Sequence, residues 1–368
     1  MLRDLTIQNY RCFKDFHINE LARVNLIVGQ NNSGKTTFLE AIYLLVHQQN
    51  IQAVFDVLSS RGETSYIQIQ GASSQVNRIK YHFEHIFYGH QLTPARSIHI
   101  RSQQEEQLSI EIQASPKNEQ VLVPAAEELE TRFLAWELIA CYNENAQFKI
   151  SLLPNATISS FVSPQSTEKN NNYSSLVGTN KDNFNLIKTT EISFKELALY
   201  WDAITLTPKE ENVVAALQIL EPDVERISFT SNPTNYSGIL IKIRGQNNPV
   251  PLGSMGNGMH RILSIAMAAV SSENGFLWVD EIDTGLYYQT QTDMWRLIFE
   301  TAHRLNVQVF ATTHSWDCIA AFQEALEQSE DSSVGQLFRL SRRGEDIRAV
   351  EYTPDELSVA VRQSIEVR

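Results

Sequence analysis

The chain has 368 residues, which is long for one compact domain, so we expect a core domain that carries a large insertion or a second lobe. Its composition, 42% hydrophobic and 20% charged, is typical of a soluble globular protein, and no apolar run is long enough to span a membrane. A formal net charge of −13 argues against a surface that binds nucleic acid or membrane through a basic net field.

The cysteines and the N-terminus indicate a reducing compartment. Cys12, Cys141 and Cys318 are far apart and form no CxxC pair, so they predict neither a disulfide framework nor a zinc site. The first residues contain no apolar signal-peptide core. We therefore expect a cytoplasmic protein.

The first 50 residues predict strands followed by a helix. An apolar run ends at Gly29, as a buried parallel strand would. Residues 35–48 then place Phe38, Ile42 and Leu45 at helical spacing, so strand, glycine-rich turn and helix follow in P-loop order. The expected strands are residues 5–9, 16–18 and 24–28.

The middle of the chain has a different pattern. From Tyr66 to Ser163 it consists of short alternating stretches such as YIQIQ, RIKYHFEHIF, SIHIRS and LSIEIQ, which predict an antiparallel lobe with one helix near residues 126–142. Residues 164–185 are rich in Asn and Ser and predict a mobile loop. We thus expect a core domain made of residues 1–70 and 201–368, with residues 71–200 inserted as the lobe.

Helices and strands alternate in the last part of the chain, which predicts an α/β fold with a parallel sheet and right-handed crossovers. The expected elements are a helix at 208–220, a strand pair near 224–243, a helix at 258–272, a strand at 276–280, a helix at 288–304, a strand at 307–312, a helix at 315–327, and a terminal strand pair with a helix.

The strongest motif is GQNNSGKT at residues 29–36, which satisfies GxxxxGK[ST] between a predicted strand and a predicted helix. Its glycines let the backbone curl around a phosphate, Lys35 reaches the β- and γ-phosphates, and the Thr36 hydroxyl binds Mg²⁺. An ordinary glycine turn is the alternative, which we discount because both flanks fit. The expected nucleotide-binding residues are Gly29, Asn31, Asn32, Ser33, Gly34, Lys35, Thr36 and Thr37.

The second motif is FLWVDE at residues 276–281, an apolar strand that ends in two carboxylates. Beside a P-loop, Asp280 is expected to hold Mg²⁺ and Glu281 to orient or deprotonate the attacking water. An ordinary strand end is the alternative. The P-loop earlier in the chain favours the functional interpretation.

A histidine follows the next predicted strand, in the turn Thr313-His314-Ser315. A lone histidine is more often structural. Parallel topology, however, brings this turn to the sheet edge where the carboxylates lie, so we expect His314 to contact the γ-phosphate.

A second glycine-rich turn, LGSMGNG at residues 252–258, precedes the helix predicted at 258–272. Backbone amides and a hydroxyl at a helix N-terminus form an anion-binding edge. Because the chain already has a P-loop, this turn would serve the nucleotide of another copy; the alternative is a simple helix cap. The residues expected to act in trans are Ser254, Gly256, Asn257 and Gly258.

These four motifs, in this order, resemble the ABC-type ATPases, specifically the RecF/SMC and OLD-like branch. The opening IQNYRCFKDFHINELARVNLIVGQNNSGKTTFLEAI resembles the N-terminus of that branch, and LGSMGNGMHRILSIA resembles its degenerate signature motif. FLWVDEIDTGLYY is similar to its Walker B strand and D-loop, and VFATTHSWDCI to its H-loop strand. The resemblance covers residues 1–50 and 200–330.

The resemblance implies a P-loop ATPase head with a mixed sheet and an N-terminal antiparallel β lobe. It also implies a head-to-tail homodimer that sandwiches two ATP molecules with Mg²⁺, in which Lys35 of one copy faces Ser254 and Gly256 of the other. By the same resemblance Asp283 lies in the D-loop at that interface, His314 is the residue that senses the γ-phosphate, and Arg11 approaches the nucleotide.

The chain departs from the family pattern in three places. Its signature reads SMGNG and not SGGQ, and Tyr287 stands where relatives often carry histidine. The Q-loop glutamine has only Gln68 and Gln70 as candidates. These departures concern the coupling between the lobes more than ATP binding.

Two absences narrow the function. Only 54 residues follow His314 and they contain no DxD pair, so we expect no TOPRIM nuclease of the OLD type. The roughly 217 residues between Thr36 and Gly253 show no sustained heptads, which excludes a long coiled-coil arm.

Three functions remain. The favoured one is an ATP-driven dimeric switch for a separate effector such as a nuclease or toxin, in DNA maintenance or anti-phage defence. The second is a DNA clamp of the RecF type, and the third, which we disfavour, is the ATPase subunit of a transporter. The residues that could form a DNA-binding groove are Lys14, Arg23, Arg78, Lys80, Arg96 and Arg101.

Overall fold

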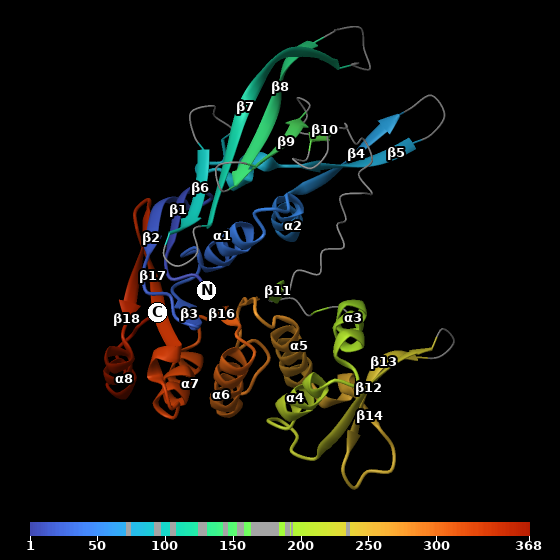
Figure 1. Cartoon of the computed structure of the whole chain (residues 1–368), viewed down its shortest axis with the longest axis vertical. Coiled ribbons are helices and arrows are strands. Elements are labelled where there is room, and N and C mark those ends of the chain that lie inside the picture. The colour runs from blue at the N-terminus through green and yellow to red at the C-terminus, as the bar shows by residue number, and fades with distance from the viewer. Residues whose placement is uncertain are drawn as a thin grey trace.

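A six-stranded sheet forms the centre of the molecule, which we call the head (Figure 1). Five strands run parallel in the order β11, β15, β16, β3 and β17, and β18 pairs antiparallel to β17 at the edge. The predicted α/β fold with a mixed sheet is thereby confirmed. The strands are β3 (Val24–Val28), β11 (Phe184–Ile187), β15 (Phe276–Val279), β16 (Gln308–Thr312), β17 (Gly335–Arg343) and β18 (Asp346–Tyr352).

The structure is a computed structural model, and it describes residues 1–70, 75–91, 97–103, 108–123, 131–142, 146–152, 158–162, 184–187, 192, 194–232 and 236–368.

The central strands β3, β15 and β16 are buried on both faces, which explains why they are mostly apolar. Along β15, Trp278 packs with Phe38 and Phe310 on one face, while Leu277 and Val279 belong to a second core on the other. This alternation follows from the two-residue period of a strand. The sheet therefore separates two hydrophobic cores, one shared with the β lobe and one with the helices below it in Figure 1.

Helices cover both faces of the head sheet (Figure 1). Local signals set several of their ends: Thr207 caps a helix that has Pro208 at its first position, and Thr353 forms a capping box with Glu356. The helices are α1 (Lys35–Val46), α2 (Gln52–Ser60), α3 (Phe194–Ile204), α4 (Pro208–Leu217), α5 (Asn257–Ser271), α6 (Tyr288–Arg304), α7 (Trp316–Glu327) and α8 (Pro354–Arg362).

A seven-stranded antiparallel sheet forms the β lobe and lies over α1. Its order, β10-β9-β8-β7-β6-β1-β2, places the two N-terminal strands beside the strands of the middle region. The strands are β1 (Leu5–Tyr10), β2 (Phe13–Ile18), β6 (Ser97–Ser102), β7 (Leu108–Val123), β8 (Thr131–Tyr142), β9 (Ala146–Leu152) and β10 (Ile158–Val162). The separate hairpin of β4 (Thr64–Gln70) and β5 (Gln75–Tyr81) completes this region.

The helix predicted near residues 126–142 is wrong. The described part of that segment is the strand β8, which pairs with β7 on one side and β9 on the other. Leu138 and Ala140 are buried on one face of the strand, so pairing on both edges outweighs the helix propensity of a segment rich in Leu and Ala. The predicted strand over RIKYHFEHIF also ends early, because residues 83–86 form the 3₁₀ helix η1 (Phe83–Ile86).

The predicted mobile loop at 164–185 lies outside the described residues up to position 183, and its last two residues begin β11. That strand pairs with β15 in the head sheet. The domain boundaries at residues 70 and 200 stay a prediction. The seven-stranded sheet contains strands from both sides of residue 70, and the head sheet contains strands from both sides of both boundaries.

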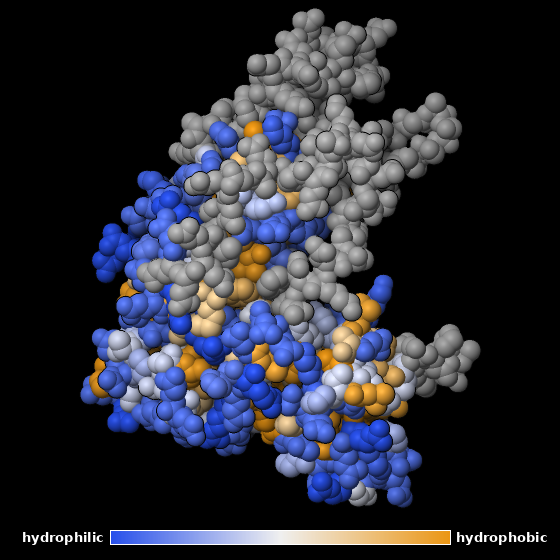
Figure 2. Space-filling model, viewed as in Figure 1, coloured by the Kyte–Doolittle hydropathy of each residue, from blue (hydrophilic) through white to orange (hydrophobic). Residues whose placement is uncertain are grey.

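A small sheet of β12 (Val224–Asn232), β13 (Tyr236–Ile243) and β14 (Val250–Pro251) flanks the head and confirms the strand pair predicted there. Figure 2 shows a mostly hydrophilic lower body, with hydrophobic residues gathered on its right side over this sheet and α3. Leu199 and Leu206 are exposed in that region. No helix within the described ranges is both long and apolar enough to cross a membrane.

Candidate functional site

The P-loop connects β3 to α1. The glycine at each end of the loop stands where a larger residue would not fit. Gly29 has a φ of 148°, and a Cβ there would lie 2.6 Å from the Leu340 carbonyl oxygen. Gly34 has a φ of 97°, and a Cβ would lie 3.1 Å from the Cys12 sulfur. The loop conformation is therefore fixed by close packing against β2 and β17, with the buried Ser33 between the two glycines.

The Lys35 ammonium contacts the backbone of the P-loop. Its Nζ donates to the carbonyl oxygens of Gly29 at 2.7 Å and Gln30 at 3.1 Å. Burial lowers the pKa of Lys35, and the negative charges of Asp280 and Glu281 act in the opposite direction. A phosphate oxygen could replace these neutral carbonyls and give the half-buried charge a negative partner.

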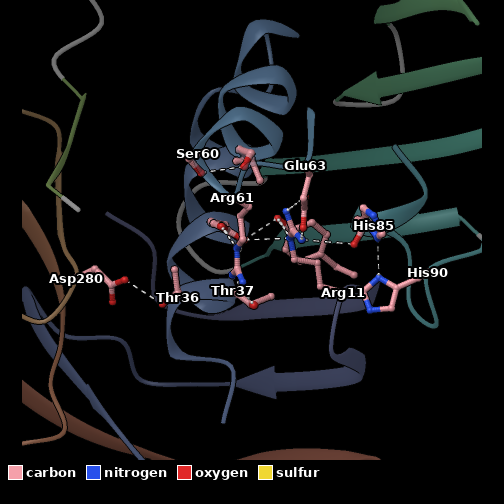
Figure 3. A network of polar contacts seen from close by, with 12 residues as sticks. Arg11, Thr36, Thr37, Ser60, Arg61, Glu63, His85, His90 and Asp280 are labelled. Carbon is pink, nitrogen blue, oxygen red and sulfur yellow. Dashed lines mark hydrogen bonds and ion pairs between the residues drawn. The ribbon is translucent and has the colours of Figure 1, made fainter. Parts of the chain in front are cut away.

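The Walker B carboxylate meets the P-loop helix directly. The Thr36 hydroxyl donates to Asp280 Oδ2 at 2.9 Å, a contact drawn in Figure 3. The other oxygen, Oδ1, accepts from the Thr312 hydroxyl at 2.5 Å. Three strands that are distant in sequence thus place a hydroxyl and a carboxylate where a hard cation could bind both.

Glu281 has a constrained backbone. Its φ is 47°, which is uncommon for a residue with a side chain, and its N–H donates to Thr312 Oγ1 at 2.9 Å. Its carboxylate lies 3.7 Å from His314 Nδ1, and both side chains are partly exposed. Strained backbone at a strand end is a feature of functional sites, and here it turns the carboxylate toward the histidine.

Arg261, which the sequence did not single out, fixes the backbone of this turn. It lies in the apolar helix α5, it is buried, and its Nη2 donates to the carbonyls of Asp280 at 2.7 Å and Glu281 at 2.8 Å. Burial lowers the pKa of Arg261, while Asp283, Asp280 and Glu281 raise it. An arginine within a helix otherwise rich in Ile, Leu and Ala was the sequence signal for such a role.

The signature turn lies on the surface. Residues 252–255 form a 3₁₀ turn, η3 (Leu252–Met255), and Gly256 follows with a φ of 87° at the start of α5. Ser254, Gly256 and Asn257 are exposed. Nothing lies within 4 Å of the position where a Cβ on Gly256 would be.

The predicted D-loop lies beside the signature turn. A Cβ on Gly258 would be 3.2 Å from the carbonyl oxygen of Gly285, so the two loops are in close contact. Asp283 accepts a hydrogen bond from the Thr313 hydroxyl at 2.5 Å, which ties this loop to the strand that carries His314. Two neighbouring tyrosines, Tyr287 and Tyr288, follow and are 60% and 50% exposed.

Arg11 pairs with two carboxylates, and its approach to the nucleotide stays a prediction. Its guanidinium makes a bidentate hydrogen bond to Glu63, at 2.6 and 2.8 Å, and lies 3.1 Å from Glu40. Burial opposes its charge, but these carboxylates and Tyr10 raise the pKa of Arg11. Arg61 belongs to the same network and contacts the P-loop helix nearer its first turn, at Thr37.

Arg61 donates to Thr37 Oγ1 at 3.1 Å and to Glu40 Oε1 at 2.7 Å. Figure 3 shows the resulting chain of contacts from the P-loop helix through Arg61 to Arg11. Sequence reasoning missed Arg61, because only tertiary packing brings the end of α2 over α1.

The remaining candidates are scattered. Gln68 and Gln70 lie on β4, and the structure describes their backbone alone. Arg23 donates to the Ala302 carbonyl and to Asn306, next to the end of α6. Lys14, Lys80 and Arg101 lie on β2, β5 and β6, and the side chains of Arg78 and Arg96 are outside the described set.

Comparison with known proteins gives a match to one family. Residues 1–232 and 203–319 match the family model described as AAA ATPase domain. An "ATP/GTP phosphatase" of Helicobacter pylori is 22% identical over 364 residues, and the alignment covers 93% of each chain. A "DNA replication and repair protein RecF" of Clostridioides difficile is 32% identical over 77 residues, 21% of each chain.

Solved structures of SMC heads also match along nearly the whole chain. An SMC head bound to the C-winged helix domain of ScpA is 13% identical, covers 96% of this chain and 97% of that one, and has a TM-score of 0.49. The SMC head domain from Thermotoga maritima is 12% identical, covers 95% and 98%, and has a TM-score of 0.45.

Proposed function

This chain belongs to the AAA ATPase domain family, and from that premise we propose that it acts as a dimeric switch driven by ATP. It is an ABC-type ATPase of the RecF/SMC kind and hydrolyses ATP. The observation that carries the proposal is the contrast between a P-loop packed into its own chain and a signature turn that is exposed.

In the proposed dimer each ATP site has two halves. The half that contains the P-loop comes from one copy, and its residues have the following roles. The loop from Gly29 to Thr37 and the ammonium of Lys35 bind the phosphates. Glu281 orients or deprotonates the attacking water, and His314 contacts the γ-phosphate. Arg261 is a positioning residue, because it acts on the backbone that carries Glu281.

Thr36 and Asp280 are proposed to hold Mg²⁺. Their oxygens lie 2.9 Å apart. Two neighbouring ligands of an octahedral ion, each bonded at 2.0–2.1 Å, are also separated by about 2.9 Å. The donor set therefore fits this ion, which when bound neutralises charge on the phosphates.

A second copy of the chain is proposed to complete the site. Ser254, Gly256 and Asn257 present a hydroxyl and a helix N-terminus to solvent, which suits an anion brought by another molecule. The same surface carries the D-loop and the two exposed tyrosines, residue types that are enriched in interfaces.

Mixing two inactive variants tests this arrangement. Lys35→Ala removes the phosphate ligand and Ser254→Arg blocks the signature turn, so each variant alone should hydrolyse little ATP. In a 1:1 mixture about half of the dimers are mixed and each has one intact site of two, so about a quarter of the wild-type rate should return. Phosphate release measures it.

Ser332→Arg is the matched control, since it places the same side chain on another exposed 3₁₀ turn, η4 (Ser332–Val334). It should hydrolyse ATP as the wild type does. If the mixture stays inactive and no ATP-dependent dimer appears by size-exclusion chromatography, the shared site is wrong, although ATP binding within one chain would stand.

The process that the switch serves is proposed to be the control of a separate effector, such as a nuclease or toxin, in DNA maintenance or anti-phage defence. The partial similarity to a protein named for DNA replication and repair supports the first setting. Affinity capture with wild type and Lys35→Ala, each with and without ATP, tests it. An effector should be retained by the wild type in ATP only.

The same similarity favours one alternative, an ATP-gated DNA clamp. The clamp is tested by measuring DNA binding in the presence of ATP at several salt concentrations. Contacts with DNA phosphates give a steep loss of affinity as the salt concentration rises. Charge reversal at the exposed Lys14 and Arg101 of the lobe should then weaken binding. Absence of DNA binding at low salt would exclude the clamp and leave the effector switch.

A further inference from the structure

Three histidines and a glutamate converge on the β lobe, in the segment between β5 and β6. They are His82, Glu84, His85 and His90, and no step proposed above for ATP hydrolysis uses them. We propose that this cluster is a binding site for a divalent transition metal of the Zn²⁺ class. Imidazole nitrogens with one carboxylate are ligands that suit zinc, whereas Mg²⁺ prefers oxygen.

The ligand atoms lie close together, and two of the distances between them are close to the spacing found in a zinc site. Those of His82, Glu84 and His85 all lie within 4.8 Å of one another. His82 Nδ1 is 3.1 Å from Glu84 Oε1, and His85 Nδ1 is 3.4 Å from His90 Nδ1. Two nitrogens bonded to a tetrahedral zinc ion at 2.0–2.1 Å are about 3.3 Å apart.

Hydrogen bonding is the competing explanation. A neutral His85 can share a proton with His90, and His82 can pair with Glu84, so each contact has an ordinary account. That account treats the two pairs as unrelated. The rings of His82 and His85 are nevertheless only 5.9 Å apart, and those of His85 and His90 only 5.3 Å, so the pairs adjoin through His85.

The backbone of this segment is already fixed. Phe83 and Ile86 bury their side chains in the lobe core from the short helix η1, which leaves Glu84 and His85 between them only partly buried. The Arg11 N–H donates to the Ile86 carbonyl and the Tyr88 N–H to the Asn9 carbonyl, both at 2.9 Å. Metal binding would therefore require little further ordering of this segment, as expected for a preformed metal site.

The charge around the cluster also suits a cation. The nearest cationic side chain in the polar network is Arg11, whose Nη1 lies 3.5 Å from the His85 carbonyl oxygen. Its charge is opposed by the carboxylates of Glu63 and Glu40. Figure 3 shows His85 and His90 at the end of this network opposite the P-loop helix, so the proposed ion is separate from the nucleotide.

Zinc titration of the full chain, free of tag and nucleotide and stripped with EDTA, tests the proposal. Isothermal titration calorimetry should give one Zn²⁺ per chain for the wild type. Bound Co²⁺, used as a spectroscopic substitute, should give the visible absorption of a tetrahedral site. Zinc should also raise the melting temperature, because an ion that binds only the folded chain stabilises it.

Two variants remove ligands with little change to the fold. His85→Gln keeps a polar side chain, and His90→Asn keeps a residue that tolerates the φ of 56° found there. Each should weaken zinc binding at least about tenfold and abolish the cobalt absorption, since coordination loses a nitrogen. His17→Gln removes an exposed histidine of β2 and should bind as the wild type does.

The results separate the two explanations. Loss of zinc binding in both variants, with ATP binding kept as the check on folding, supports the site. A wild type that takes up no zinc at micromolar concentration overturns it and leaves the hydrogen-bonded pairs. So does zinc binding that both variants retain. Neither result depends on whether the ATPase site is shared between two copies.

Discussion

The chain contains two glycine-rich turns that each precede a helix, and the two turns differ in how closely the rest of the chain packs against them. The P-loop at residues 29–36 is enclosed: a Cβ on Gly29 would meet the Leu340 carbonyl and the Ser33 side chain. The signature turn at residues 252–258 is open, with nothing within 4 Å of the corresponding position on Gly256.

In the proposed dimer, the enclosed P-loop is the part of the site that one copy completes by itself, and the open turn is the part that it presents to its partner. Close packing fixes the P-loop amides before any ligand arrives, and preorganisation of this kind lowers the cost of binding. The exposed turn has a φ of 87° at Gly256, a conformation that favours glycine, although nothing in its own chain packs against that position. Four variants test this contrast, and they are given in order of decreasing expected effect.

Glu281→Gln should lower ATP turnover by about 10²–10³-fold, because an amide cannot accept the proton from water. ATP binding should persist, and the trapped complex should elute as a dimer in ATP and Mg²⁺. Phosphate release and size-exclusion chromatography measure the two effects. Glu300→Gln, an exposed change on α6, should alter neither. Unchanged turnover in Glu281→Gln would remove Glu281 from the mechanism.

Gly29→Ala should lower the free energy of unfolding by about 3 kcal/mol and abolish ATP binding, because the new methyl meets backbone that cannot move aside. Gly62→Ala should cost only about 1 kcal/mol, since its φ of 68° is strained but its surroundings are open. Urea unfolding and nucleotide binding measure the difference. Equal effects would contradict the picture of an enclosed P-loop.

Arg261→Met should destabilise the fold by about 2 kcal/mol, because it leaves the Asp280 and Glu281 carbonyls without their charged donor. ATP turnover should fall while ATP affinity changes little, since the residue acts on the backbone of Glu281. Thermal unfolding and steady-state kinetics test this. A variant that binds ATP more weakly but turns it over at the normal maximal rate would show that Arg261 serves the P-loop instead.

Tyr287→Ser with Tyr288→Ser should weaken the ATP-dependent dimer about tenfold, or about 1.4 kcal/mol, without affecting nucleotide binding. The dimer is measured by analytical ultracentrifugation in the Glu281→Gln background. Leu199→Ser removes a side chain of similar exposure on α3 and should leave the dimer intact. Weakening by Leu199→Ser alone would place the interface at α3 instead.

Local patterns predicted most of the head and its site. The apolar run of β3 and the helical spacing after Lys35 gave element bounds close to those observed, and parallel topology correctly brought Asp280 beside Thr36. Patterns failed at β8, where pairing on both edges decided the conformation. They also missed Arg261 and Arg61, whose partners are set by packing between distant elements.

By itself, the sequence determined the α/β head, its ATPase chemistry and the positions of the two glycine-rich turns, because glycines, a lysine and strand-end carboxylates act through backbone geometry that a short segment specifies. Only the tertiary structure decided which turn is enclosed and which is open. It also decided that Arg11 pairs with Glu63 and Glu40, and that three histidines meet beside it. These outcomes depend on packing between segments far apart in the chain, and no local pattern encodes such contacts.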